Sequence, residues 1–237
     1  MNNYDVFLDS LEAKKWAGLG SAPLTPMEDR LIGRYLTEKK SHVLEAGCGS
    51  GRISFALEEA GLEGIDAFDY SESMLAKATD NKAIRNSRVK FFCMEASDLT
   101  NLVSNSYDYL VYLQQVICFL PPDRIENALS EGRRVLRRGG IAIFSYLNYR
   151  KLSFRHMCRL KLLKIVRRIR NEDVPDQCLP WVRLGQELNQ SFFSRGQSCN
   201  YWFRQEEFIG LLERTGFAVV ETRDEPTSRS SFVVCRK

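Results

Sequence analysis

The sequence predicts an α/β fold in which a mostly parallel sheet lies between two layers of helices. Over residues 42–60, a buried strand runs into a glycine-rich loop and then into a helix. An acidic residue, Asp69, ends the next strand about twenty residues after Gly49. Strand and helix patterns continue to alternate up to residue 146. Such alternation is typical of a parallel sheet that is covered by helices on both faces.

Local signals define the order of the elements. Residues 3–17 and 26–39 are predicted to form two N-terminal helices, and Thr25, Pro26 and Glu28 have the spacing of a capping box. Ser71 is the expected N-cap of the helix after the second strand. The pair Gly139-Gly140 is expected to end a helix and turn the chain into a strand. The other predicted elements are strands at 42–46, 64–69, 88–93, 107–112 and 141–146 and helices at 52–60, 72–79, 122–138 and 204–215.

The composition indicates a water-soluble chain with one α/β domain. It has 237 residues, 44% of them hydrophobic, and no apolar run of about eighteen residues that would predict a membrane span. The N-terminus lacks the apolar centre of a signal peptide, and the seven cysteines form no C-x-x-C pair, so a reducing cytoplasm is expected. The two histidines, His42 and His156, have no partner at metal-ligand spacing, and no metal is expected.

Residues 147–203 interrupt the alternation with a basic insertion. The net charge is +4, and residues 151–170 contain eight basic and no acidic residues, which leaves 26 basic and 30 acidic residues elsewhere. Residues 160–170 have an apolar face of Leu162, Ile165, Val166 and Ile169 and a basic face of Lys161, Lys164 and Arg168. The upstream basic stripe through Arg155 and Arg159 does not continue the downstream one. A kink or two short helices are therefore expected near Leu160.

Several functions fit this basic segment. A lid helix with a solvated basic face is the simplest interpretation, and contact with an anionic or bulky substrate is the next. Contact with RNA and transient contact with a membrane are further alternatives. Few aromatic residues suited to base stacking lie within the segment, which weakens the case for RNA.

The glycine-rich loop predicts a ligand site. Glycine at positions 47, 49 and 51 lets backbone N–H groups and a helix N-terminus approach a ligand that side chains would block. The nicotinamide fingerprint G-x-G-x-x-G does not fit, because Arg52 stands where its third glycine should fall. Asp69 stands where a cofactor-binding βαβ unit has its ribose-binding carboxylate, whereas the rival Asp66 lies within the strand. A nucleotide-like cofactor is therefore expected.

Five sequence blocks in order resemble a class I S-adenosylmethionine-dependent methyltransferase. They are VLEAGCGSGRISFALEEAG, IDAFDYSESMLAKA, VKFFCMEASDL, YDYLVYLQQVICFL and EGRRVLRRGGIAIFSY, and a weaker match resumes at YWFRQEEFIGLLERTGF. The resemblance implies a three-layer αβα sandwich with a doubly wound seven-stranded sheet and a C-terminal antiparallel hairpin, 217–222 and 231–236. The expected single domain divides into N-terminal lid helices (1–40), cofactor-binding core (41–146), substrate-lid insertion (147–203) and C-terminal helix and hairpin (204–237).

The resemblance also implies roles at the carboxyl edge of the sheet. The glycine loop is expected against the methionine and ribose parts of S-adenosylmethionine, and Asp69 is expected to accept both ribose hydroxyls. Met74 is expected at the adenine face. Glu95 and Ala96 are expected at the adenine edge, with Asp98 as the alternative to Glu95. The full set of expected cofactor residues is Glu45, Gly47, Gly49, Asp69, Tyr70, Met74, Glu95, Ala96 and Gln114.

Methyl transfer from a sulfonium is an in-line displacement, so the protein mainly aligns the nucleophile with the methyl group and excludes water. No fixed catalytic pair is expected, and Tyr146 and His156 are only weak catalytic candidates. The segment Leu113-Gln114-Gln115-Val116 lacks the Asn/Asp-Pro-Pro-aromatic motif of the DNA-amino methyltransferases, which argues against base methylation by that mechanism. The candidate substrate residues are Tyr4, Trp16, Gln115, Tyr201 and Trp202, and ordinary packing explains each of them at least as well.

These expectations describe a cytoplasmic enzyme that transfers a methyl group to an oxygen or nitrogen of a small molecule. An anionic acceptor would suit the basic insertion, and the cofactor product would be S-adenosylhomocysteine. One alternative is a tRNA or rRNA methyltransferase that holds phosphates with residues 151–170. The other is a regulatory module that binds the cofactor without turnover.

Overall fold

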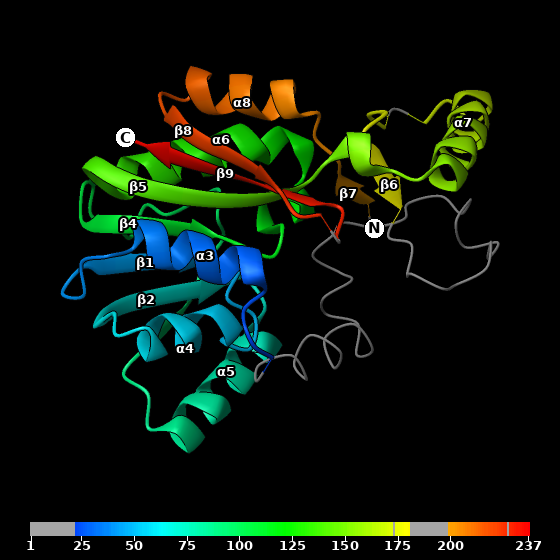
Figure 1. Ribbon diagram of the computed structural model, residues 1–237. Coiled ribbons are helices and arrows are strands. Elements are labelled where there is room, and N and C mark those ends of the chain that lie inside the picture. The colour runs from blue at the N-terminus through cyan, green and yellow to red at the C-terminus, as the bar shows by residue number, and fades with distance from the viewer. Residues whose placement is uncertain (1–21, 173, 181–198, 227) are drawn as a thin grey trace.

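The computed structural model describes residues 22–172, 174–180, 199–226 and 228–237. Seven strands form one sheet in the order β3-β2-β1-β4-β5-β9-β8 (Figure 1). Strands β1 (His42–Ala46), β2 (Gly64–Asp69), β3 (Lys90–Cys93), β4 (Tyr107–Tyr112) and β5 (Leu136–Leu147) are parallel. Strands β8 (Ala218–Asp224) and β9 (Ser230–Arg236) form the antiparallel hairpin, with β9 next to β5. The predicted doubly wound sheet with its C-terminal hairpin is confirmed.

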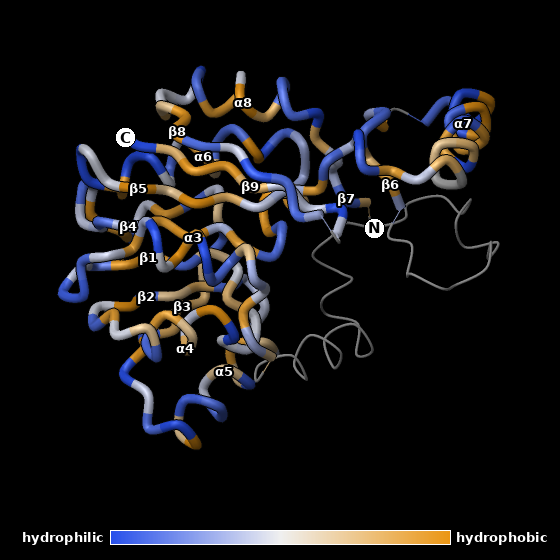
Figure 2. The backbone as a smooth tube through the Cα atoms, in the orientation of Figure 1, coloured by the Kyte–Doolittle hydropathy of each residue, from blue (hydrophilic) through white to orange (hydrophobic). Residues whose placement is uncertain are grey.

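Alternate residues of the central strands pack into two cores on opposite faces of the sheet. Helices α6 (Pro122–Val135) and α8 (Gln205–Arg214) cover the face that contains Leu44 and Leu110. Helices α3 (Pro26–Tyr35) and α4 (Arg52–Glu59) cover the face that contains Val43 and Val111. Figure 2 shows the apolar strands between helices whose outer surfaces are largely polar. This arrangement is the predicted three-layer sandwich.

Two of the predicted helix caps are confirmed. Thr25 accepts a hydrogen bond from the backbone N–H of Glu28, whose carboxylate in turn accepts one from the N–H of Thr25. Ser71 caps α5 (Glu72–Arg85), which continues six residues beyond the predicted end. It ends at Asn86, which adopts a left-handed conformation with φ of 51°.

The prediction that Gly139 and Gly140 end a helix is wrong. Helix α6 ends at Val135, and Leu136 already pairs with Tyr107 at the start of β5. The next ladder pair of these two strands joins Tyr109 to Ile141, so the intervening residues of β5 form an irregularity that contains both glycines. Gly139 has φ of +76°, and a Cβ on Gly140 would lie 2.9 Å from backbone carbonyl oxygens. The glycines therefore serve a bulge in the strand.

The insertion differs from its prediction as well. Helix α7 runs without interruption from Phe154 to Ile169, so neither a kink nor two short helices form. It packs near a small antiparallel sheet of β6 (Cys178–Pro180) and β7 (Cys199–Tyr201). The whole unit lies beyond the carboxyl end of β5, at the periphery of the molecule (Figure 1). No helix in the described parts of the chain is long and apolar enough to span a bilayer.

Candidate functional site

The glycine-rich loop joins β1 to α4 in a conformation that requires glycine. Gly47, Gly49 and Gly51 all have positive φ, at 63°, 54° and 93°. A Cβ on Gly47 would lie 2.5 Å from the side chain of Val116, and a Cβ on Gly51 would lie 2.5 Å from the ring of Phe55. A Cβ on Gly49 would meet no atom within 4 Å. Gly47 and Gly51 therefore have no room for a side chain, whereas Gly49 faces open space.

Asp69 holds this loop from the end of the neighbouring strand. It is the last residue of β2, and its two carboxylate oxygens accept hydrogen bonds from the N–H of Gly49 at 2.8 Å and from the N–H of Ser71 at 2.9 Å. Burial raises the pKa of this carboxyl, and the backbone donors partly oppose the shift. The backbone N–H of Tyr70 also donates to this carboxylate. A carboxylate has about four acceptor positions, so one remains for a hydroxyl donor of a ligand. Asp66, by contrast, accepts a hydrogen bond from the Tyr107 hydroxyl within the sheet.

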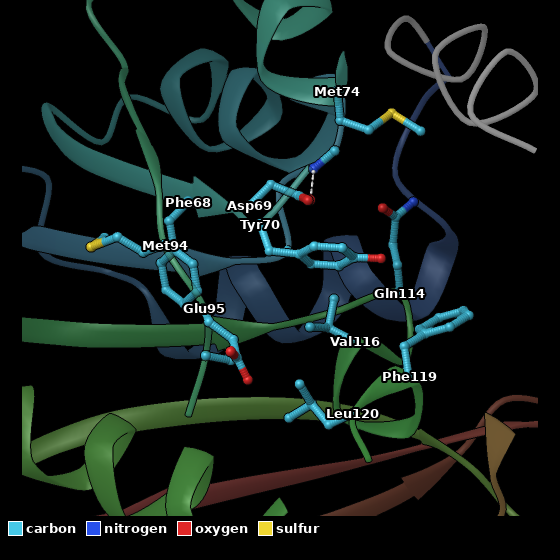
Figure 3. A pocket seen from close by; sticks show the side chains of 13 residues that line it. Phe68, Asp69, Tyr70, Met74, Met94, Glu95, Gln114, Val116, Phe119 and Leu120 are labelled. Atoms are coloured by element: carbon cyan, nitrogen blue, oxygen red, sulfur yellow. Dashed lines mark hydrogen bonds between the residues drawn. The ribbon is translucent and has the colours of Figure 1, made fainter. Parts of the chain in front are cut away.

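A cavity opens directly beside these groups. It has a volume of about 800 Å³ when the open space at its mouth is included. Figure 3 shows Asp69, Tyr70 and Gln114 around it, with Val116, Phe119 and Leu120 on one side. Its lining residues are Gly47, Gly49, Phe68, Asp69, Tyr70, Met74, Met94, Glu95, Ala96, Gln114, Val116, Phe119 and Leu120. All of the expected cofactor residues except Glu45 therefore meet at one cavity.

Glu95 lines the cavity, and its carboxylate is bound by two residues that were not among the predicted site residues. Both of its oxygens lie 2.7 Å from Nη1 of Arg124 on α6, and Oε1 also accepts a hydrogen bond from the Ser97 hydroxyl at 2.6 Å. This ion pair fixes the loop after β3 against α6. Asp98, the alternative to Glu95, instead accepts hydrogen bonds from Thr100 and does not line the cavity.

Gln114 is held by a buried arginine. With the amide orientation that satisfies its hydrogen bonds, its oxygen accepts from Nε and Nη2 of Arg52 at 2.7 and 2.8 Å. The other N–H groups of Arg52 donate to both carboxylate oxygens of Glu28 and to the carbonyl of Pro23. All five guanidinium donors thus have an acceptor. The network joins α3, α4 and the end of β4, and it fixes Gln114 at the cavity wall.

The backbone at Gln114 and at the next residue has an unusual conformation. Gln114 and Gln115 both adopt positive φ, at 57° and 59°, which is rarely found for residues other than glycine. The N–H of Gln115 donates to the Ser145 hydroxyl at 2.8 Å, which helps to hold this turn. Such strained positions cluster at functional sites. The side chain of Gln115 does not line the cavity, although it was a candidate substrate residue.

Glu45 lies beneath the loop instead of on the cavity wall. It is 2% exposed and accepts a hydrogen bond from the Ser54 hydroxyl of α4. Burial raises the pKa of its carboxyl to about 8, and the nearby Arg52 opposes the shift. Glu45 therefore supports the loop from below, and its burial favours the neutral carboxyl form.

The other candidate side chains lie elsewhere. Tyr146 is buried in the core against Phe208 and Phe203, so it does not reach the cavity. Tyr201 donates to Glu207 at 2.5 Å, and Trp202 packs with leucines of the insertion.

Two further groups of candidates fall beyond the described side chains. Tyr4 and Trp16 lie outside the described residues. For His156 the structure describes only its backbone, within α7.

Sequence reasoning missed the apolar part of the cavity. Phe68 and Met94 directly precede predicted cofactor residues. Val116 and Phe119 lie in a short 3-10 helix after Gln114, η2 (Val116–Phe119), and Leu120 follows it. These residues lie close to the carboxyl ends of predicted strands, and that position could have identified them as cavity residues. Arg52 and Arg124 gave no such signal, because their partners are distant in sequence. In the described part of the chain, no cluster of His, Cys, Asp or Glu is arranged to hold a metal ion.

Comparison with known proteins agrees with this geometry. Residues 43–140 match the family model described as a methyltransferase domain. An S-adenosyl-L-methionine-dependent Diels-Alderase, iccD, from Talaromyces variabilis is 26% identical over 85% of this chain and 61% of its own length. The tRNA N(3)-cytidine methyltransferase METTL2 from Bos taurus is 25% identical over 76% of this chain and 42% of its own length. The chain thus spans about half the length of the curated relatives it matches.

Solved structures show the same fold. An S-adenosylmethionine-dependent methyltransferase from Methanosarcina mazei superposes with a TM-score of 0.70 at 19% identity, covering 91% of this chain and 98% of that one. The magnesium protoporphyrin IX methyltransferase of Synechocystis PCC 6803, with bound S-adenosylhomocysteine, has a TM-score of 0.66 at 16% identity and 99% coverage of both chains. The chain therefore has the fold of the class I S-adenosylmethionine-dependent methyltransferases.

Proposed function

We propose that this chain, which has the class I methyltransferase fold, transfers a methyl group from S-adenosylmethionine to an oxygen or nitrogen of a small molecule. The observation that carries the proposal is the convergence at one cavity of the glycine loop and a buried carboxylate that retains a free acceptor position. A ribose hydroxyl is a suitable donor for this position. When bound, the cofactor would supply an activated methyl group on a sulfonium.

In this proposal, each residue around the cavity contacts a different part of the cofactor. Asp69 holds the ribose, and Met74 packs on the adenine face. Glu95, held in place by Arg124, and the N–H of Ala96 meet the adenine edge. Gly49 leaves the space that the ligand occupies, and Gln114 stands beside the reactive end.

The character of the wall supports a small and largely apolar acceptor. Val116, Phe119 and Leu120 form an apolar side of the cavity, which would exclude water during the displacement. Among the described residues that line the cavity, none is basic. A phosphate-rich acceptor would find no counter-charge there. We therefore place any anionic part of an acceptor outside this cavity, toward the basic insertion.

An RNA acceptor is the second candidate. Two observations favour it: the basic residues of α7, and the likeness to a relative named as a tRNA methyltransferase. A nucleic acid bound through such residues would dissociate steeply with rising salt.

The test is transfer of labelled methyl into a host-cell extract that lacks the enzyme, fractionated into small molecules, RNA, protein and lipid. Asp69→Ala protein is the control, because it should bind S-adenosylhomocysteine about tenfold to a hundredfold more weakly. Label in the small-molecule fraction, lost with Asp69→Ala, would support the proposal. Label in RNA would replace the acceptor by the second candidate. Cofactor binding without label in any fraction would contradict methyl transfer.

A further inference from the structure

Helix α7 carries its apolar stripe on the side that faces away from the protein. Of the eight large apolar side chains exposed in the described residues, four lie on this helix: Phe154, Leu162, Ile165 and Ile169. Together with the exposed Cys158 they recur at spacings of four, four, three and four residues, which places them on one face of a helix. The other four exposed apolar residues lie singly on other elements, as is normal for a protein surface.

The opposite side of α7 is packed against the protein, so the stripe is exposed although the helix is well anchored. Leu160 and Leu163 are each 4% exposed, and Leu160 packs with Leu152, Leu179 and Trp202. Arg167, on the same inward side, donates to the carbonyl of Cys178 at 2.8 Å. The helix is therefore firmly packed through one face while the more apolar face stays outside. The apolar face predicted for this helix is therefore exposed, and Lys161 and Arg168 of its predicted basic face are exposed beside it.

Basic residues flank the exposed stripe on both sides. At 100° per residue, Lys161 and Arg168 lie on one flank, and Arg159 and Arg170 lie on the other. Lys161 and Arg168 are exposed, and no carboxylate of the described residues forms an ion pair with either. Residues 151–170 contain no acidic residue at all. Figure 2 shows the polar and apolar residues interleaved along this peripheral helix.

We propose that α7 docks on an anionic lipid bilayer surface. The apolar stripe would enter the boundary between headgroups and acyl chains, and the flanking Lys and Arg side chains would reach the anionic headgroups. Each basic residue near such a surface strengthens binding roughly fivefold. A helix of 16 residues is about 24 Å long, so it would lie along the surface and not cross it.

The position of the stripe favours lipid over nucleic acid. The exposed stripe includes Phe154, Leu162, Ile165 and Ile169, which would have to lie against the phosphates if RNA approached from this side. Apolar groups gain nothing from phosphates, whereas they gain from burial in acyl chains. The proposal depends on α7 alone and not on the proposed methyl transfer.

The experiment is flotation of the full chain with phosphatidylcholine vesicles that contain or lack one third phosphatidylglycerol. Wild-type protein should float only with the anionic vesicles. The double variant Leu162→Gln/Ile165→Gln should partition at least about tenfold more weakly. Lys161→Gln/Arg168→Gln should bind roughly twenty-fivefold more weakly, since it removes two charges. Ile84→Gln on α5 is the matched control, because it replaces an exposed helical isoleucine far from α7, and it should float like wild type.

Binding of S-adenosylhomocysteine, measured by calorimetry on the same variants, separates this proposal from the proposed function. The α7 variants should bind it like wild type, because their substituted side chains are exposed and do not line the cavity. Absence of wild-type flotation with anionic vesicles would overturn the proposal. Equal flotation of wild type and both double variants would overturn it too, as would displacement of the protein from vesicles by transfer RNA through the same basic residues.

Discussion

Two arginines are buried to the same degree in two regions of the molecule, but they have different partners. Arg52, beside the cavity, is 8% exposed and forms a bidentate ion pair with Glu28, which is itself buried. Arg167, in the insertion, is also 8% exposed, but its described partners are the carbonyl of Cys178 and the sulfur of Cys199. The first arginine neutralises a buried charge. The second donates to neutral groups at the base of α7.

The two arginines therefore serve different purposes. Arg52 fixes the wall of the cavity, whereas Arg167 attaches a peripheral helix. Near the cavity, the five hydrogen bonds of Arg52 tie three elements together and fix the lining residue Gln114. In the insertion, Arg167 joins the inward side of α7 to β6 and β7, and the apolar stripe lies on the opposite side. Loss of the first should therefore damage folding and the site together, and loss of the second should damage neither.

The largest effect is expected from Arg52→Met. The substitution leaves the Glu28 carboxylate buried without its cation, which typically costs about 3–5 kcal/mol of stability. Urea denaturation of the variant should show a loss in this range. Adding Glu28→Gln removes the stranded charge and should restore part of the stability. A loss below about 1 kcal/mol in the single variant would mean that the ion pair contributes little, and the contrast between the two arginines would fail.

Gly49→Val tests whether the loop faces the ligand. Valine at φ of 54° is strained, and its side chain would extend into the space beside Asp69, so S-adenosylhomocysteine binding should fall by more than about a hundredfold. Gly139→Val is the matched control. Gly139 also has positive φ, and a Cβ there would again meet no atom within 4 Å, but this glycine lies in the β5 bulge, away from the cavity.

The two glycine variants should lose similar stability and differ only in binding. Calorimetry with S-adenosylhomocysteine and thermal unfolding of both proteins give the two readouts. Retained affinity in Gly49→Val would show that the ligand approaches from another side.

Features set by neighbours in sequence were predictable, and features set by distant partners were not. The Thr25 cap depends on Glu28 three residues away, and the glycine loop shows its conformational need in its own residues. The end of α6 depends instead on the pairing of Leu136 with Tyr107. Local periodicity could not show that pairing, so the helix was predicted too long.

The same limit applies to the site and to the insertion. Gly47 and Asp69 were identifiable because the chemistry of a βαβ cofactor unit specifies their positions. Arg52 was visible only as the residue that breaks a nicotinamide fingerprint, because its partner Gln114 is far along the chain. For α7 the periodicity revealed the apolar stripe but could not tell which side faces the core. That choice depends on acceptors for Arg167 that lie on β6 and β7.

A smaller effect is expected from Glu45→Gln, and it should depend on pH. The folded-state pKa of about 8 lies above the ordinary value of a glutamate, so the unfolded chain ionises first as the pH rises. Wild type should therefore lose stability relative to the variant from about pH 4.5 to pH 8. The difference in stability between the two proteins can change by at most about 1.4 kcal/mol per pH unit. We expect a total change of about 2 kcal/mol, because relaxation around a buried carboxylate lowers the cost of its ionisation.

Thermal or urea unfolding of both proteins at pH 5 and pH 8.5 measures this difference, because all other titrating groups are shared. Glutamine keeps an acceptor for the Ser54 hydroxyl, so the substitution removes only the ionisation. Parallel stability curves would mean that Glu45 is ionised in the folded protein, with Arg52 shared between it and Glu28.

The smallest effect is expected from Arg167→Met, the counterpart of Arg52→Met. No carboxylate of the described residues forms an ion pair with Arg167, so its removal strands no charge there. The carbonyl of Cys178 loses one donor, which costs about 1 kcal/mol, and the apolar side chain packs against the leucines around it and offsets part of that loss. Stability in urea should change by less than about 1 kcal/mol, and S-adenosylhomocysteine binding should not change. A loss as large as that of Arg52→Met would show that Arg167 neutralises a carboxylate in solution, and the two regions would then be built on the same principle.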